Sequence, residues 1–345
     1  MKRLFLLLCF SLLLAGCGKY DEKDVVYDLN KLNDEINSYI VTGNLDILNN
    51  DQVYTYDVEV SYEKGDKYRV VLTNSDNNYT QIILKNDEGV YVLTPALNKS
   101  FKFQSEWPYS DSQSYIITSV IGDIDNDKDR EFKELDNGYE FVTKIKYLNN
   151  DKLVKQKILL DKDLNIKEVR VFDDKDVEVL KMKYKEIKYD SKFSDDHFDL
   201  ETIMKDYAPK DDSANNSSCD ESTCKEESET TGLLEDSIYP LFLPEGTKLV
   251  SEEEVVMDDG KRIIMTFDGE KSFLLVQETI KKEDEMVVIP TFGEPYQLMD
   301  TLGVMTDNSL TWQSGGIEYY IVSDVLSSNE LIEVAQSISV LPTMK

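Results

Sequence analysis

The sequence predicts an α+β protein in which a long antiparallel meander, covered by helices, is followed by a second, smaller α+β module. Large apolar side chains alternate with small or charged ones over residues 54–62 and 139–147, the period of a strand with one buried face. Helical spacing of apolar residues over 28–40 predicts an amphipathic helix ahead of the meander. A polar stretch with almost no apolar residues, 208–234, separates the two modules.

The meander has one face that must be covered. After the run 54–62, further strands are expected at 68–73, 79–85, 90–94, 101–103, 139–147, 154–160, 166–172 and 177–188. Six apolar side chains gather on one face of the first strands, and a bare patch of that size is unusual on a soluble protein. They are Tyr54, Tyr56, Val58, Val60, Tyr62 and Tyr68. A helix opening at Ser110, with Gln113 as its capping partner, could cover them together with the helix at 28–40, and a bound apolar ligand is the alternative.

The second module is predicted from short strands and one capped helix. Strands are expected at 248–257, 262–267, 272–280, 310–313 and 317–323, with turns at Asp268-Gly269 and around Gly315. Ser327 and Glu330 have the spacing of a capping box, so a helix should begin there. Residues 195–204 are expected to form a short closing helix or an extended tail of the first module.

The first seventeen residues indicate export. Lys2 and Arg3 precede an apolar run of eleven residues at 4–14, too short to span a bilayer but typical of a signal peptide. Leu14-Ala15-Gly16-Cys17 resembles the bacterial lipobox, which implies that Cys17 becomes a lipidated N-terminus; an ordinary secretory signal is the alternative. The expected organisation is a signal peptide (1–16), a tether (17–26), a first domain (27–207), an acidic linker (208–236) and a second domain (237–345).

The net charge of the chain disfavours some classes of binding partner. The chain has 68 acidic and 38 basic residues and a formal net charge of −30, which disfavours binding to nucleic acid or to anionic lipid headgroups. Membrane attachment is therefore expected through the lipid on Cys17, at the extracytoplasmic face of the cell membrane. Of the remaining cysteines, Cys219 and Cys224 could form a disulfide in an oxidising compartment, although the short loop would stabilise little.

One acidic run has partial calcium-loop spacing. Asp123, Asp125, Asp127 and Glu134 fall at positions 1, 3, 5 and 12 of such a loop. Lys128 stands where the loop requires glycine, so a solvated turn is the competing interpretation, and no other cofactor is expected. His197 is the only histidine, and no nucleophile or phosphate-loop motif accompanies it, so the sequence predicts a non-catalytic protein.

The layout also resembles a known superfamily. A leading helix, a long meander and a helix after Trp107-Pro108 are similar to the LolA/RseB-like proteins of bacterial envelopes. The segments that carry the resemblance are 89–95, 103–108 and 160–165. Segment 103–108 is similar to lipoproteins of spore-forming Gram-positive bacteria, including the germination lipoprotein group. The second module, with Leu243-Pro244-Glu245-Gly246, resembles C-terminal domains of envelope lipoproteins and stress sensors.

The resemblance implies a helix-covered half-barrel and two possible activities. In the first, the aromatic face of the half-barrel binds a lipid or the acyl chain of a lipoprotein. In the second, the half-barrel is packed, and the protein is a scaffold or regulator of a cell-wall or spore-cortex enzyme, or of envelope signalling. Because a lipid anchor would prevent shuttling between membranes, the resemblance favours a local role over carriage in solution.

Overall fold

The computed structural model describes residues 20–49, 52–108, 112–147, 150–209, 234, 236–257 and 260–338. Cys17, Cys219, Cys224 and most of the predicted linker lie outside these residues. The helices are α2 (Glu22–Glu35), α3 (Ile117–Asn126), α4 (Leu200–Asp206) and α5 (Ser328–Gln336), with a 3-10 turn η2 (Pro95–Leu97). No helix among the described residues is both long enough and apolar enough to cross a bilayer.

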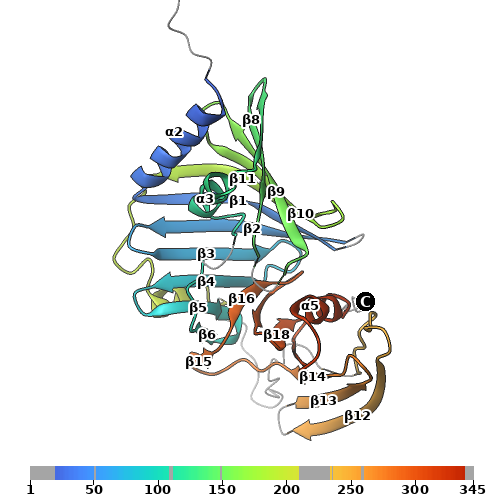
Figure 1. The fold of residues 1–345 in the computed structure, drawn as a ribbon. Coiled ribbons are helices and arrows are strands. Elements are labelled where there is room, and N and C mark those ends of the chain that lie inside the picture. Colours follow the sequence, from blue (N-terminus) through green and yellow to red (C-terminus); the bar gives the residue numbers. More distant parts are fainter. Residues whose placement is uncertain are drawn as a thin grey trace, which may run out of the picture.

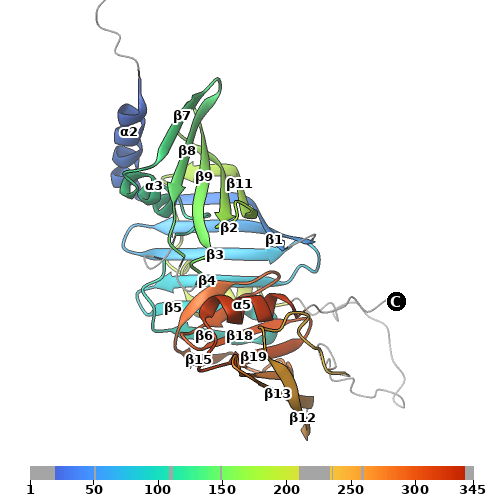
Figure 2. The ribbon, with the colours of Figure 1, turned by 45° about the vertical axis from the view of Figure 1, so that its right-hand side comes forward.

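The first domain is built on a twelve-stranded sheet. Its strands run in the order β15-β6-β5-β4-β3-β2-β1-β11-β10-β9-β8-β7. Their bounds are β1 (Ser38–Asn49), β2 (Gln52–Glu63), β3 (Lys67–Asn74), β4 (Thr80–Asn86), β5 (Gly89–Thr94), β6 (Lys99–Phe103), β7 (Glu131–Leu135), β8 (Gly138–Lys144), β9 (Leu153–Asp161), β10 (Ile166–Asp173), β11 (Glu178–Tyr189) and β15 (Val287–Thr291). The two halves of the meander join where β1 pairs with β11. Figure 2 shows β7, β8 and β9 running steeply across the direction of β1 to β4, so the sheet is bent as a half-barrel requires.

Helices α2 and α3 cover the concave face of this sheet (Figure 1). Val25 and Leu29 of α2, and Val120 and Ile121 of α3, are at most 1% exposed and share one core with the inner side chains of the strands. The convex face at β3 to β5 has a separate core, to which Ile203 of α4 contributes. The predicted α+β half-barrel is therefore confirmed.

The second sheet has seven strands and one helix on its covered face. The order is β12-β13-β14-β19-β18-β17-β16. The strands are β12 (Lys248–Met257), β13 (Gly260–Asp268), β14 (Phe273–Thr279), β16 (Glu294–Gln297), β17 (Leu302–Met305), β18 (Ser309–Ser314) and β19 (Ile317–Val322). The predicted capping box begins α5, where the Glu330 carboxylate accepts from the Ser327 backbone N–H at 2.9 Å. In the second half of the chain, sequence patterning did not indicate β15, β16 and β17; β15 pairs with β6, and Leu302 of β17 packs into the core of the first domain.

The prediction of one helix over 28–40 is wrong at both ends. Helix α2 begins at Glu22, where Asp21 is the N-cap, and ends at Glu35, so the expected tether is shorter than 17–26. Residues 38–49 form β1, which pairs with β2 and β11 over its length. Gly43 does not end a helix: it lies at a β-bulge, where an added Cβ would come within 2.3 Å of the Lys183 carbonyl oxygen.

The predicted cap of the next helix is also wrong. Helix α3 begins at Ile117, its N-cap Ile116 has no side-chain hydrogen bond, and Ser110 lies outside the described residues. Gln113 precedes the helix, and its backbone N–H donates to the Ser119 hydroxyl at 2.9 Å. Residues 112–117 are buried, so packing against the half-barrel, rather than local capping, decides where this helix starts.

Candidate functional site

The six apolar side chains predicted to face a ligand lie in the core of the half-barrel. Tyr56, Val58, Val60 and Tyr68 are at most 3% exposed. Tyr54 and Tyr62 are partly buried and pack against the same core. Helices α2 and α3 therefore share the core that covers these side chains, together with Trp107, Tyr115 and Ile116 from the segment between β6 and α3. None of the six lines the cavities described below.

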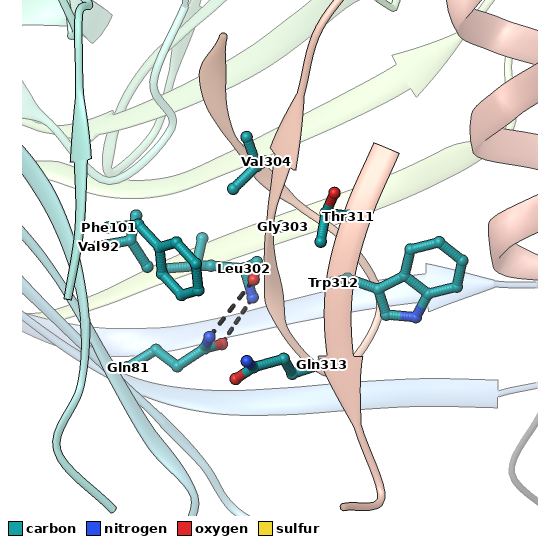
Figure 3. A pocket seen from close by; sticks show the side chains of 9 residues that line it. All are labelled: Gln81, Val92, Phe101, Leu302, Gly303, Val304, Thr311, Trp312 and Gln313. Carbon is teal, nitrogen blue, oxygen red and sulfur yellow. Dashed lines mark hydrogen bonds between the residues drawn. The ribbon is translucent and has the colours of Figure 1, made fainter. Parts of the chain in front are cut away.

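A segment of the second sheet completes this cover. Leu302 of β17 is 5% exposed and belongs to the core of the half-barrel, with Val304 packed beside it. Figure 3 shows Leu302 facing Val92 and Phe101 of the first sheet. The second domain thus contributes an apolar side chain to the concave face of the first.

Gln81 of β4 fixes the position of that segment. Its side-chain oxygen accepts from the Leu302 backbone N–H at 2.6 Å, and its amide donates to the Leu302 carbonyl at 3.4 Å (Figure 3). The same oxygen accepts from the Thr301 hydroxyl at 3.0 Å. All three residues are at most 5% exposed. Since a buried polar group left without partners costs about 1–3 kcal/mol, Gln81 and the 301–302 backbone form a matched pair.

Further contacts extend the interface between the domains. The Tyr56 hydroxyl donates to the Met299 carbonyl at 3.0 Å, and the Asn150 amide donates to the Tyr296 hydroxyl at 2.9 Å. Lys152 forms an ion pair with Glu333 of α5. Strand β15 crosses between the domains and pairs in parallel with β6, from Val287 opposite Lys99 to Thr291 opposite Phe103.

Two small cavities remain where the domains meet on the concave side. One of about 20 Å³ lies between Gln81 and Trp312, and one of about 60 Å³ lies between Trp107 and Tyr296. Both are far below the roughly 300–1,000 Å³ of typical small-molecule sites.

A larger cavity of about 240 Å³ lies elsewhere along the same interface. It is lined by Asn77, Tyr79, Ala96 and Leu97 of the first domain and by Ile280, Asp300, Gln313, Ser314, Gly315 and Gly316 of the second. Asp300 is its acidic group, and the Ser314 hydroxyl donates to the Asp300 carboxylate. Burial raises the pKa of the Asp300 carboxyl, and the charge of Asp300 in turn helps to raise the pKa of the Tyr79 hydroxyl, which burial raises most.

The four candidate calcium ligands do not converge. The Asp123 carboxylate accepts from Ser112 and Gln156, at 3.0 and 2.8 Å. Asp125 accepts from the Asn30 amide at 2.8 Å, Asp127 accepts from the Lys144 backbone N–H at 2.7 Å, and Glu134 pairs with Lys162 at 3.3 Å. Helix α3 carries Asp123 and Asp125, whereas Glu134 is in β7. Within the described ranges no three acidic, histidine or cysteine side chains form a group able to hold a metal ion.

His197 lies beside α4 on the convex side of the half-barrel. Its ring stacks on Phe193 with centroids 4.4 Å apart. Burial, assisted by the nearby Arg69, lowers the pKa of the His197 imidazole to about 4. The ring is therefore neutral at physiological pH and packs as part of an aromatic cluster.

Sequence reasoning did not find the residues of the interface. Gln81 lies in a strand pattern in which a polar residue is expected on the solvent face, and Asp300 stands in a stretch without a strong period. One signal was present: Asp300 is a single charge between the apolar pairs Leu298-Met299 and Leu302-Gly303. An acid in such surroundings indicates a buried carboxylate, but its partner could not be named without the tertiary structure.

Comparisons with known proteins place the chain in a family. Sporulation protein YdcC of Bacillus subtilis (strain 168) is 35% identical over 327 residues, which cover 94% of this chain and 93% of that protein. Among solved structures, the Pseudomonas aeruginosa MucA/MucB complex matches at 14% identity with a TM-score of 0.31, over 91% of this chain and 98% of the other. A LolA superfamily protein of Nitrosomonas europaea matches at 11% identity with a TM-score of 0.31, over 52% and 98%.

A member of the LolA superfamily, which the layout of the sequence resembles, is thus among the solved structures that the chain matches. The family described as sporulation protein YdcC-like matches residues 1–198, more than half of the sequence. Together with the 35% identity to the Bacillus subtilis protein over nearly the whole chain, this match establishes that the chain belongs to the YdcC-like family of sporulation proteins.

Proposed function

We propose that this chain is a lipid-anchored, non-catalytic protein of the envelope of sporulating cells, which acts there by binding another protein. One observation carries the proposal: the concave face of the half-barrel is occupied by α2, α3 and Leu302 of the same chain. An acyl chain could enter only by displacing them, and their burial opposes this because each fully buried aliphatic side chain contributes about 1.5–3 kcal/mol. The cellular setting is taken from the family.

Strand β12 offers the partner a surface. Among the described strands it pairs with β13 alone, so its other edge presents free backbone N–H and C=O groups. Val256 is 78% exposed and Val250 50% exposed. Glu253 and Glu254 are also exposed on this strand, and Glu254 forms an ion pair with Lys261 at 2.7 Å. An extended segment of a partner could hydrogen-bond to the free backbone groups of β12, and lysine or arginine side chains on it could pair with the exposed glutamates.

Site-specific photocrosslinking tests this function. The full chain is expressed in a spore-forming host with a photoreactive amino acid in place of Val256, and in a control in place of Val177, which is 54% exposed in the turn between β10 and β11. We expect a light-dependent adduct of one discrete mass from position 256 and none from position 177. Adducts from both positions, or from neither, would contradict a partner surface on β12.

Acyl binding by the half-barrel is the competing function, and native mass spectrometry of the mature protein separates the two. Protein binding predicts the mass of the chain with no lipid beyond that on Cys17. A second, non-covalent acyl species, lost from a Leu302→Trp variant that fills the concave face further, would support acyl binding instead.

The proposed anchor has its own test. Cys17→Ser should move the protein from the membrane fraction to the medium, because the thioether that holds the lipid cannot form. Cys9→Ser, which lies within the expected signal peptide, is the matched control and should leave the protein at the membrane. If Cys17→Ser still sediments with membranes, the lipid anchor is wrong.

A further inference from the structure

The cavity of about 240 Å³ between the two domains has the features of a binding site. It is partly open to solvent, and its volume is just below the roughly 300 Å³ at which small-molecule sites begin. Its walls come from both domains: the η2 turn and the residues before β4 on one side, and the loop before β17 with the β18–β19 turn on the other. A ligand in this cavity would be small, and it would contact both domains at once.

Asp300 gives the cavity its charge. Among the described residues no lysine or arginine acts on its carboxylate, which accepts a hydrogen bond from the Ser314 hydroxyl. Asp300 is half-buried, and a carboxylate that is partly removed from water without a positive partner destabilises the fold, because it loses more hydration energy than one hydroxyl returns. Burial accordingly raises the pKa of the Asp300 carboxyl. A ligand with a positive charge would supply the counter-ion that Asp300 does not have within the described residues.

Gln313 provides an independent observation. It is 6% exposed and lines the same cavity. Its amide nitrogen donates to Glu318 at 2.8 Å, but its side-chain oxygen has no hydrogen-bond partner. Buried acceptors are normally satisfied, so a hydrogen-bond donor at this oxygen, from a water or from a ligand, is favourable. Gln313 also lines the cavity of about 20 Å³ beside Gln81 (Figure 3). A hydrogen-bond donor would therefore satisfy both Asp300 and Gln313, and a positively charged donor would also neutralise the Asp300 carboxylate.

The remaining walls are apolar. Ala96, Leu97 and Ile280 present aliphatic surface, and Tyr79 presents an aromatic ring. Such walls suit a short hydrocarbon portion, and an aromatic ring also attracts cations. A bare metal ion fits poorly, because hard cations require six or more oxygen ligands and no three acidic side chains gather here or elsewhere in the described residues.

We propose that this cavity binds a small organic ammonium compound, with its charged head at the Asp300 carboxylate and its aliphatic part against Leu97 and Ile280. Contact with both domains makes such a ligand a stabiliser of their arrangement. The acidic chain, with a net charge of −30, also favours the approach of a cation over that of an anion.

Calorimetric titration with three matched probes tests the proposal. The mature chain, residues 17–345 with Cys17→Ser to keep it in solution, is titrated with pentylamine, pentanol and pentanoate. These probes share a five-carbon chain and differ in the charge of the head. We expect pentylamine to bind at least tenfold more tightly than pentanol, and pentanoate to give no binding. Equal affinity for pentylamine and pentanol, or no binding of pentylamine at millimolar concentration, overturns the proposal.

Two variants assign the binding to this cavity. Asp300→Asn should abolish the preference for pentylamine, while Asp307→Asn, which changes an exposed carboxylate of the same domain, should keep it. Because asparagine can still accept from Ser314 without a buried charge, Asp300→Asn should unfold at the same temperature as the wild type or higher. Ala96→Phe fills the cavity from the other domain and should also remove binding. Full pentylamine affinity in Ala96→Phe, or in Asp300→Asn, contradicts the site even if the other variant does not fold.

Discussion

The two sheets differ in how many of their faces are covered. In the twelve-stranded sheet, β4 and β5 are buried on both faces, by the α2–α3 core on one side and by the α4 cluster on the other. In the seven-stranded sheet, β14 alternates between buried and accessible residues, because α5 covers one face while Leu274 and Tyr320 on the other are 39% and 38% exposed. The first sheet is therefore enclosed on both faces at β4 and β5, whereas the second sheet keeps one face partly accessible.

The largest difference in unfolding free energy should appear between truncation of an enclosed side chain and truncation of an exposed one. Phe141 is 0% exposed and packs against Phe132 with ring centroids 5.0 Å apart, so Phe141→Ala should lower the free energy of unfolding by about 3–5 kcal/mol. Val177→Ala, at an exposed turn of the same sheet, should change it by less than about 0.5 kcal/mol. Chemical denaturation monitors both, and similar losses would mean that the half-barrel is not the rigid part.

The pH dependence of stability should come from Asp123 of α3, the helix that covers the concave face of the enclosed sheet. Burial raises the pKa of the Asp123 carboxyl from 3.8 to about 6, although hydrogen bonds from Ser112 and Gln156 oppose the shift. The folded state therefore binds this proton more tightly than the unfolded state. The stabilisation is complete below about pH 4 and is lost as the pH rises through 6, a change on the order of 3 kcal/mol at most.

Asp123→Asn should remove this contribution from the profile of unfolding free energy between pH 4 and 6. Ser112→Ala, which deletes a hydrogen bond that favours the charged carboxylate, should steepen it. An unchanged profile in Asp123→Asn would show that the carboxylate is better hydrated than its position indicates.

Loss of the contact between the two sheets should lower the free energy of unfolding by an intermediate amount. Gln81→Leu leaves the Leu302 backbone N–H and the Thr301 hydroxyl without their acceptor, and should cost about 1–3 kcal/mol. Gln104→Leu changes an exposed glutamine of the same domain, directly after β6, and should be nearly neutral. Limited proteolysis should then cut the Gln81→Leu protein faster within 294–305. If both variants resist protease equally, the second domain is not held through Gln81.

The smallest effect on stability is expected on the open sheet. Val256→Thr replaces a side chain that is 78% exposed with another β-forming residue, so the free energy of unfolding should stay within about 0.5 kcal/mol of the wild type. If β12 contacts a partner, the crosslink from a probe at the neighbouring Glu254 should nevertheless weaken in this variant. A large loss of stability would show that Val256 belongs to the fold rather than to a surface for binding.

Local signals were sufficient where an element depends on its own residues. The capping box of Ser327 and Glu330 begins α5 as predicted, because both hydrogen bonds lie within one turn. Strands β2, β3 and β14 appear where alternation predicted them, since one face of each meets a core. Local signals were misleading at the start of β1. The helical stripe of Leu29, Leu32 and Ile36 runs up to this segment, but the segment itself alternates as a strand does, with apolar residues at Tyr39, Val41, Leu45 and Ile47.

By itself, the sequence determined the class of the protein, an antiparallel half-barrel with helices followed by a second sheet, because burial period and capping are written in neighbouring residues. Only the tertiary structure decided what fills the half-barrel and where a cavity remains. Leu302 reaches the concave face across 221 residues from Gln81, and Asp300 meets Tyr79 only when the domains are together. Contacts at such separation depend on the packing of whole sheets, which no local period records.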